Sequence, residues 1–213
     1  LNPHVLDRQT CGSSAGSGAA TAAMLAAGSV GTETNGSIIC PSNANGIVGF
    51  KPTVGLVSQA GIVPISSSQD TAGPMTRTVT GAAMMLTAMA TGEGATDFTT
   101  GLFDTALEGR RIGVMRFTVS DQPGVAEAFD AALEVLAAEG AVLVEIPDFE
   151  QQVENFGESA FLVLLHEFKI TLNEYLEGTP ETVEARTMAE LIAFNEAHAE
   201  EELAIFGQDL FVE

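Results

Sequence analysis

The sequence predicts an α/β fold, and two observations support that class. First, short apolar runs with the composition of strands alternate with longer segments in which apolar residues recur every three or four positions, the period of a helix face. Second, a strand, a helix and another strand follow one another within residues 110–147. Because a strand that leads through a helix to the next strand normally pairs with it in parallel, a β-α-β unit is expected there.

The N-terminal half combines small residues with short candidate elements. "GAATAAMLAAG" (Gly18–Gly28) predicts a buried helix, because it consists of strong helix formers with little side-chain bulk. "SVGTET" (29–34) is a candidate strand, and Gly46–Ser58 contains two extended segments interrupted by glycine and proline. A second helix is expected from Thr80. Residues 91–108 are polar and contain glycine, so they are expected to form a connecting loop.

The C-terminal half shows clearer periodicity. In the β-α-β unit, "RRIGVMR" and "AVLVEIP" are the expected strands, and Val125–Glu139 is the expected helix, ended by Gly140. Glu158–Leu176 repeats the helical period. "TMAE" (Thr187–Glu190) has the spacing of a capping box at the start of a further helix, and Gly207 suits its far end. No internal repeat and no second domain are expected.

Composition and charge exclude several classes of protein. Hydrophobic residues make up 46% of the 213 residues and charged residues 17%, which excludes a disordered chain. The net charge of −21 argues against a nucleic-acid partner, which requires clustered Lys and Arg. No apolar run has the length of a membrane span, so no membrane partner is expected. Most of the negative charge lies in residues 101–213, which predicts a solvated acidic face or, alternatively, an acidic rim that favours cationic substrates.

The two cysteines give no metal-binding pattern. Cys11 and Cys40 lie 29 residues apart, without the paired spacing of a metal site. Reduced thiols with packing roles in a cytoplasmic protein are therefore expected, and no signal peptide can be judged from a chain that starts at Leu1.

The Gly/Ser-rich segment 11–41 allows three interpretations. A flexible linker is disfavoured because a small-residue helix, a strand and an apolar run follow at once. A nucleotide-binding loop at a helix N-terminus is a second possibility, with Glu33 near the ribose-binding spacing from Gly12. However, "GSSAGSG" lacks the lysine of a phosphate-binding loop and does not match G-x-G-x-x-G.

The third interpretation is catalytic and depends on Ser37 in "GTETNGS". A serine that ends a tight turn can present its hydroxyl while successive backbone amides point at one spot and form an oxyanion hole. The candidate amides belong to Thr34, Asn35, Gly36 and Ser37. Such a serine needs a base, and none of the histidines lies near it in sequence, so a Ser-His-Asp triad is unsupported. His4 lies before the Gly/Ser-rich loop, and solvated or core roles are expected for His166 and His198, which lie in acidic helices.

The motifs themselves resemble the amidase signature family. "GSSAGSGAATAAMLAAGSVGTETNGSIICPSNANGIVGFKPTVGLVS", followed by "GIVPISSSQDTAGPMTRTV", carries the resemblance over residues 2–90. "LLHEFKITLNEYL" and "LIAFNEAHAEEE" are most similar to the peptide amidase branch. The resemblance implies a core in which a mixed β-sheet is flanked by helices, and hydrolysis of amide C–N bonds by a Ser-Ser-Lys triad.

The resemblance also implies roles for individual residues. Ser37 would be the nucleophile and Ser13 the bridging serine, with a cis peptide at Gly12–Ser13. A neutral lysine, its pKa lowered by burial, would take a proton through the bridging serine. Lys51 and Lys169 match other positions of the family, so neither is assigned as the base.

The resemblance carries expectations about the whole protein too. An internal fragment of one domain is expected, with the lysine in a missing N-terminal segment and further chain missing at the C-terminus. Residues 1–90 would be the signature region and 109–213 an acidic β-α-β and helical region. No metal and no organic cofactor are implied. The substrate would be a small amide or peptide amide, favouring deamidation of C-terminal peptide amides, and the oligomeric state stays open.

The sequence leaves two points open. The amidase subunit of a tRNA-dependent amidotransferase is an alternative within the family, and a nucleotide-binding module is an alternative outside it. Asn35 stands where most members have glycine, so it either narrows the substrate range or has no effect.

Overall fold

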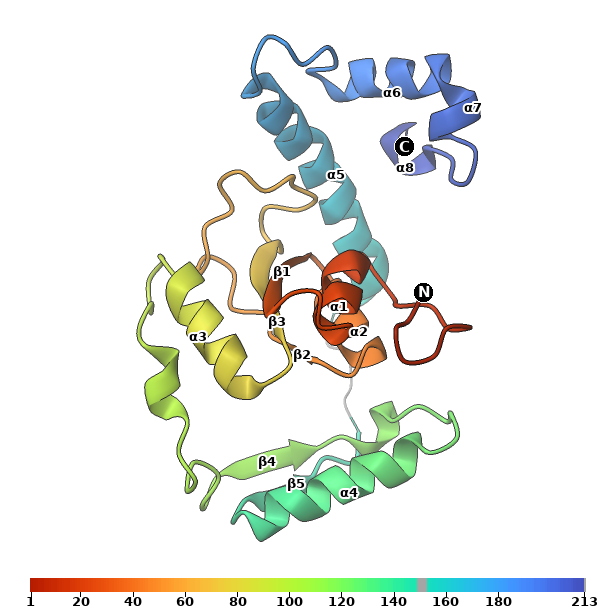
Figure 1. The fold of residues 1–213 in the computed structure, drawn as a ribbon. Coiled ribbons are helices and arrows are strands. Elements are labelled where there is room, and N and C mark those ends of the chain that lie inside the picture. Colours follow the sequence, from red (N-terminus) through yellow and green to blue (C-terminus); the bar gives the residue numbers. More distant parts are fainter. Residues whose placement is uncertain (149–152, 213) are drawn as a thin grey trace. The chain divides into compact units, whose positions relative to one another are not determined.

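The computed structural model describes residues 1–148 and 153–212 and divides the chain into two compact units (Figure 1). One unit contains residues 1–97 and 157–213, and the other contains residues 98–156. Residues 157–213 thus group with the N-terminal signature region rather than with the β-α-β unit that precedes them in sequence. Helices flank sheets in a mixed α/β architecture, as predicted.

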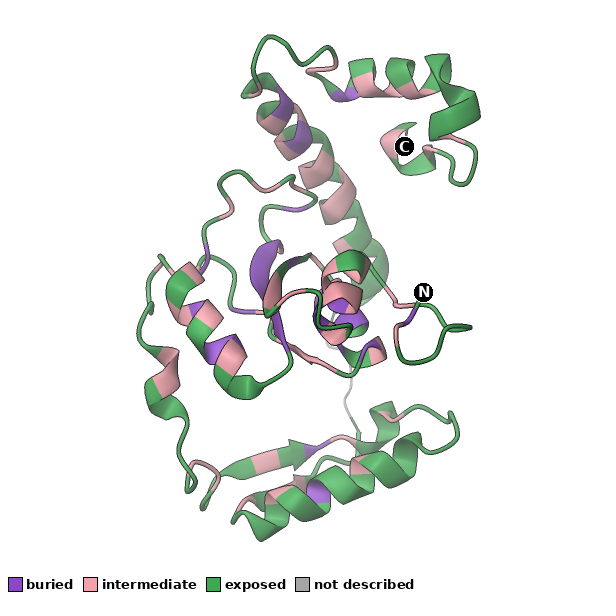
Figure 2. Ribbon diagram, in the orientation of Figure 1, coloured by how far each residue is buried: buried purple, intermediate pink, exposed green. Residues whose placement is uncertain are grey.

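The first unit is built on an antiparallel sheet with the order β1-β3-β2. Its strands are β1 (Gly28–Glu33), β2 (Val48–Gly49) and β3 (Thr71–Thr76). Every residue of the central strand β3 is buried (Figure 2). This strand was not predicted, because "TAGPMT" contains glycine and proline and shows no alternation. Of the extended segments predicted within 46–58, only β2 is a strand.

Three helices accompany this sheet, namely α1 (Ala15–Ala22), α2 (Ile39–Ala44) and α3 (Val79–Met89). α1 begins at Ala15, three residues before the helix predicted over 18–28, and it ends at Ala22. Met24 adopts a left-handed φ of 60°, and Arg77 donates to the carbonyl oxygens of Thr21 and Ala26, so the chain turns there toward β1. The prediction of a buried helix holds only in part, since Met24 is exposed.

The C-terminal helices are α5 (Phe156–Glu177), α6 (Met188–Ala197), α7 (Ala199–Glu202) and α8 (Asp209–Val212), and all their residues except Phe156 belong to this unit. Leu172 and Leu176 of α5 form a small core with Met188 of α6. The predicted N-cap is present, because Thr187 Oγ accepts a hydrogen bond from the Glu190 amide. The Glu190 carboxylate accepts from the Arg186 amide, and this hydrogen bond lowers the pKa of Glu190.

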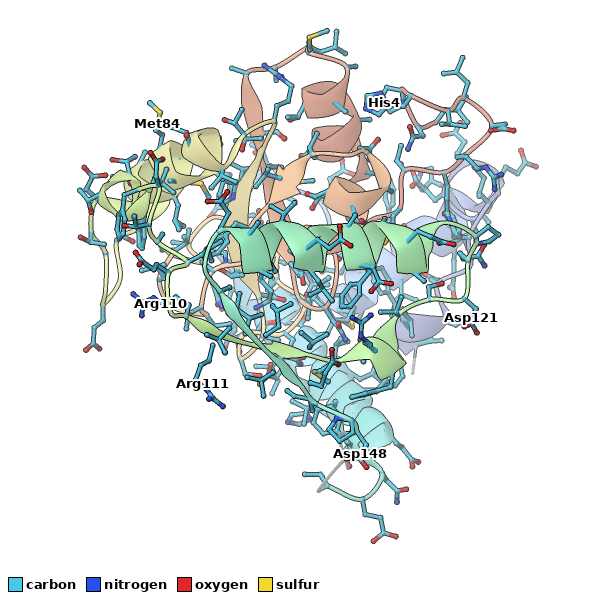
Figure 3. The ribbon with its side chains drawn as sticks, turned by 90° about the horizontal axis from the view of Figure 1, so that it is seen from below. His4, Met84, Arg110, Arg111, Asp121 and Asp148 are labelled. Carbon is cyan, nitrogen blue, oxygen red and sulfur yellow. A yellow bond between two sulfur atoms is a disulfide. The ribbon has the colours of Figure 1, made fainter. Side chains whose placement is uncertain are left out.

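The second unit contains the predicted β-α-β arrangement. Its elements are η1 (Phe98–Gly101), β4 (Arg111–Val114), η2 (Arg116–Thr118), α4 (Val125–Ala138) and β5 (Val142–Glu145). β4 and β5 pair in parallel, which confirms the prediction. Arg116 forms ion pairs with Asp130 of α4 and Glu145 of β5. The side chains of Arg110 and Arg111 extend away from the ribbon (Figure 3).

Gly73 of β3 tests how closely the first unit is packed. A Cβ at this position would lie against the Phe50 carbonyl oxygen and 2.9 Å from Cδ of Pro52. We expect Gly73→Ala to lower the free energy of unfolding by about 1–3 kcal/mol or more, because the backbone atoms must move. Gly157→Ala in α5 is the control, since nothing lies within 4 Å of its added Cβ. Urea unfolding of both variants measures the difference, and equal stabilities would contradict this packing.

Candidate active site

The two predicted catalytic serines lie on neighbouring loops of the first unit. Ser13 precedes α1, and Ser37 lies between β1 and α2. The amide of Ser14 donates to the carbonyl oxygen of Ser37 at 3.2 Å. The Ser14 hydroxyl also bonds to both the amide and the carbonyl oxygen of Thr32, each at 3.1 Å. These contacts hold the start of α1 against the end of β1 and bring the two loops together.

The Gly12–Ser13 peptide is cis, as the resemblance implies. Ser13 is exposed and Ser37 is half-buried. Among the described residues, neither hydroxyl makes a hydrogen bond. The structure therefore connects the two loops through the backbone and leaves both hydroxyls open to other groups.

A buried carboxylate organises the loop that carries Ser37. Glu33, at the end of β1, is 6% exposed and points back into its own loop. Its Oε1 accepts a hydrogen bond from the amide of Gly36 at 2.7 Å. Its Oε2 accepts from the amides of Ile38 at 2.7 Å and Ile39 at 2.9 Å. The carboxylate thus binds amides on both sides of Ser37 and fixes the turn between β1 and α2.

This arrangement corrects one part of the predicted oxyanion hole. The sequence predicts that the Gly36 amide points at the same spot as its neighbours, but this amide donates to Glu33 instead. Gly36 has a φ of 96°, a left-handed conformation that suits glycine and turns the chain at this point. The amides of Thr34, Asn35 and Ser37 have no hydrogen-bond partner in the part of the chain that the structure describes. They are the remaining candidates for donors to an oxyanion.

A second carboxylate holds the side chain of Thr34. Oδ1 of Asp70 accepts from Thr34 Oγ1 at 2.5 Å, and Oδ2 accepts from the amides of Ile65 and Ser66 at 2.7 and 2.8 Å. Asp70 is 8% exposed. It therefore connects the loop of Ser37 to the segment before β3. Sequence reasoning assigned no role to Asp70 and gave Glu33 only a weak nucleotide-binding one, although an acid four residues before the proposed nucleophile is a visible signal.

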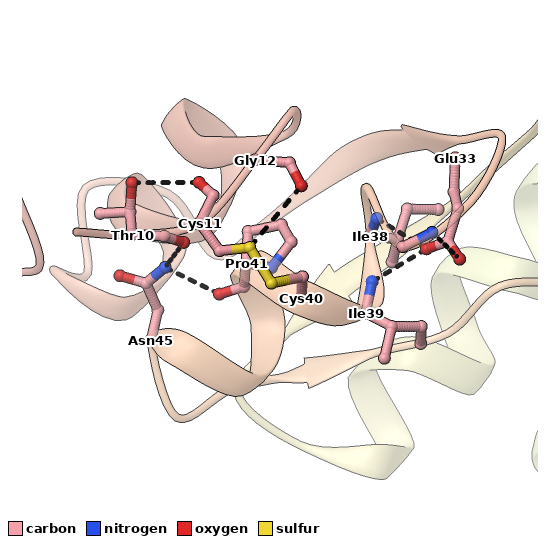
Figure 4. The surroundings of a disulfide bond; sticks show 10 residues. Thr10, Cys11, Gly12, Glu33, Ile38, Ile39, Cys40, Pro41 and Asn45 are labelled. Carbon is pink, nitrogen blue, oxygen red and sulfur yellow. Dashed lines mark hydrogen bonds between the residues drawn. A yellow bond between two sulfur atoms is a disulfide. The ribbon is translucent and has the colours of Figure 1, made fainter.

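The cysteines form a disulfide, which corrects the prediction of two reduced thiols (Figure 4). Cys11 directly precedes Gly12, and Cys40 lies in the first turn of α2, with their Cα atoms 5.8 Å apart. The two cysteines are 29 residues apart in sequence, and α1 and β1 between them bring the chain back beside Cys11. Their proximity is therefore not visible in the sequence. Asn45 supports the same corner by donating to the carbonyl oxygens of Thr10 and Pro41 (Figure 4). The disulfide joins the Ser13 loop to the helix that follows Ser37.

Within the described residues, the histidines and the two lysines named above make no hydrogen bond to either serine. His4 Nε2 lies 3.1 Å from the Asn45 carbonyl oxygen, and His198 Nδ1 lies 2.9 Å from the Phe194 carbonyl oxygen. His166 is exposed. The exposed positions of His166 and His198 agree with the solvated or core roles expected for these two histidines.

The described residues show neither a metal site nor a membrane span. Within residues 1–148 and 153–212, no three His, Cys, Asp or Glu side chains are grouped as a metal site would require. None of the helices in this described part of the chain combines the length and apolar character of a membrane span.

Comparison with known proteins identifies the family. The Amidase family model matches residues 1–204, so the chain belongs to the amidase family. The solved structure of the native peptide amidase from Stenotrophomonas maltophilia superposes with a TM-score of 0.83 and is 42% identical, covering 99% of this chain and 45% of that one. This similarity agrees with the peptide amidase branch indicated by the motifs.

Two curated relatives are also similar over most of the chain. A probable amidase from Arabidopsis thaliana is 37% identical over 228 residues, covering 99% of this chain and 43% of the plant protein. A glutamyl-tRNA(Gln) amidotransferase subunit from Thermosynechococcus vestitus is 44% identical over 156 residues, covering 68% of this chain and 32% of that protein. The chain thus spans less than half the length of these relatives.

The role of Glu33 can be tested by removing its charge. We expect Glu33→Gln to lower the free energy of unfolding by about 1–3 kcal/mol, because the amide nitrogen of glutamine cannot accept from a buried N–H group. Glu93→Gln, at an exposed acid of the same unit, is the control and should change stability by less than about 0.5 kcal/mol. Chemical denaturation of both variants gives the comparison. Equal stabilities would show that the carboxylate does not hold the loop.

The disulfide gives a separate prediction. The denatured, unreduced chain should show no free thiol in a thiol-titration assay, and two after reduction. Replacing both cysteines with serine should cost about 3–4 kcal/mol of stability, from the chain entropy of a loop with a separation of 29 residues. Two titratable thiols in freshly purified, unreduced protein would contradict the pairing.

Proposed function

We propose that this chain carries the nucleophile and the bridging serine of an amidase that hydrolyses amide C–N bonds through a Ser-cisSer-Lys triad. The observation that carries the proposal is the position of Ser37, on a turn fixed by a buried carboxylate and joined by a backbone hydrogen bond to the loop of Ser13. A loop held in this way can present a hydroxyl beside backbone amides that are not already hydrogen-bonded. Acyl transfer requires such donors beside the nucleophile, because negative charge develops on the carbonyl oxygen.

In the proposed reaction, Ser37 Oγ attacks the carbonyl carbon of the amide. The proton of Ser37 passes to Ser13, while Ser13 gives its own proton to a neutral lysine. The amides of Thr34, Asn35 and Ser37 stabilise the negative charge that develops on the carbonyl oxygen. The lysine then returns its proton through Ser13 to the leaving nitrogen, the C–N bond breaks, and water hydrolyses the acyl-enzyme. No metal or organic cofactor takes part in this scheme.

We assign the base in this scheme to a lysine outside these 213 residues, as the resemblance to the family implies. Lys51 and Lys169 match other positions of the family, and within the described residues neither makes a hydrogen bond to a serine of the pair. A buried amine is suited to the role, because desolvation lowers the pKa of a lysine and leaves it neutral near pH 7. We propose that the N- and C-terminal segments of the same enzyme, which lie outside these residues, pack against this chain and complete the site.

The proposed substrate class is a peptide with a C-terminal amide. The similarity to a peptide amidase at 42% identity supports this choice. The second candidate is the amidase subunit of a tRNA-dependent amidotransferase, supported by the relative at 44% identity, although that match covers only 68% of the chain. Release of ammonia into solution from a peptide amide, without partner subunits, distinguishes the first from the second.

Ser37 is the residue on which this proposal depends. In the enzyme expressed from its complete reading frame, we expect Ser37→Ala to lower kcat by at least about 10³-fold, because the substitution removes the oxygen that forms the proposed acyl-enzyme. Circular dichroism should show an unchanged fold. Ser120→Ala, at a serine of the second unit, is the matched control. Ammonia release by Ser37→Ala at a rate near that of the control would rule out the nucleophile.

A further inference from the structure

One carboxylate outside the proposed triad collects an unusual set of hydrogen bonds. Oε2 of Glu167, on α5, accepts from Ser66 Oγ at 2.5 Å, from Ser68 Oγ at 2.9 Å and from the Ser68 amide at 3.1 Å. The donors lie about a hundred positions earlier in the chain. The Ser66 hydroxyl first, and the Ser68 amide second, lower the pKa of Glu167. These hydrogen bonds therefore favour the charged form of the group.

The segment that Glu167 contacts is the Asp70 loop, which we define as residues 58–70. The structure describes this whole segment and places no helix or strand in it, so its shape depends on individual hydrogen bonds. Ser66 is fully buried. Its hydroxyl donates to Glu167, and its amide donates to Asp70 at 2.8 Å. Gln59 closes the loop by donating to the carbonyl oxygen of Asp70 at 2.6 Å.

The Asp70 loop leads directly to the proposed active site. Asp70 accepts from the Thr34 hydroxyl at 2.5 Å, and the Thr34 amide is one of the proposed oxyanion donors. A continuous chain of hydrogen bonds thus runs from Glu167 through Ser66 and Asp70 to Thr34. Each link is short, and all four members are at least half-buried, so the hydrogen bonds are strengthened by their surroundings and compete little with solvent.

We propose that Glu167 is a positioning residue, which orients the oxyanion donor at Thr34 by holding the Asp70 loop. This role rests on the proposed function, because it concerns the same site. Glu167 touches no reacting atom in this scheme. It acts by reducing the freedom of the loop, so that the Thr34 amide is already aimed when charge develops on the carbonyl oxygen.

The test compares two conservative variants of the same helix in the enzyme from its complete reading frame. Glu167→Gln removes the charge and places an N–H₂ group among the Ser66 and Ser68 donors. Glu158→Gln is the control, at an exposed acid in the first turn of α5. We expect Glu167→Gln to lower kcat about tenfold, less than the loss from deleting an oxyanion donor outright. KM should stay within about twofold, because ground-state binding does not use the oxyanion donors.

Inhibitor binding separates positioning from general destabilisation. A serine hydroxyl adds to the carbonyl carbon of a peptide aldehyde, and the carbonyl oxygen of the aldehyde becomes an oxyanion. The peptide acid product forms no such adduct. Glu167→Gln should weaken the aldehyde about tenfold and leave the affinity for the product unchanged. Combined with Thr34→Val, it should show a non-additive loss of kcat, since both changes break one chain of hydrogen bonds.

The outcomes distinguish this inference from the proposed function. If Glu167→Gln matches Glu158→Gln in kcat and in aldehyde affinity, the positioning role is wrong. If it weakens product and aldehyde equally, Glu167 has only a general structural role and the inference is also overturned. In both cases Ser37→Ala would still be inactive if the enzyme is a serine amidase. Activity of Ser37→Ala would instead overturn the proposed function itself.

Discussion

The structure around the two serines depends on the burial of one charge. A carboxylate removed from water is costly unless its oxygens are fully hydrogen-bonded, and Glu33 meets that requirement with amides of the loop that follows it. The burial of Glu33 and the conformation of the turn are therefore one coupled event. The left-handed corner at Gly36, the direction of the Ser37 segment and the beginning of α2 all follow from satisfying this carboxylate.

A disulfide and a second carboxylate also hold the loops of the two serines. The disulfide joins the segment before Ser13 to α2, and Asp70 holds the side chain of Thr34. Both reduce the conformations open to the loops, and in the proposed reaction such preorganisation would help to stabilise the transition state.

Local patterns in the sequence predicted the elements that depend on local forces. The β-α-β unit, α5 and the Thr187 cap follow from periodicity and spacing within a few residues, and the structure has them. The strand β3 could not be predicted, because all its residues are buried and its sequence therefore lacks the alternation of apolar and polar residues that indicates a strand. The disulfide and the grouping of residues 157–213 with the signature region depend on contacts distant in sequence. The motifs predicted the two serines as catalytic residues, and Glu33, four residues before Ser37, was a visible signal whose contacts only the structure shows. The hydrogen bonds of Asp70 to the Ser37 loop depend on residues distant in sequence.

Amide hydrogen exchange, resolved residue by residue, tests the central claim most directly. If the Glu33 carboxylate organises the loop, the amides of Gly36, Ile38 and Ile39 should exchange slowly, while those of Asn35 and Ser37 exchange fast. This alternation within consecutive residues would not arise from burial of the loop as a whole. Uniformly fast exchange across residues 35–39 would contradict the account, because it would mean that the carboxylate does not hold the turn on which Ser37 lies.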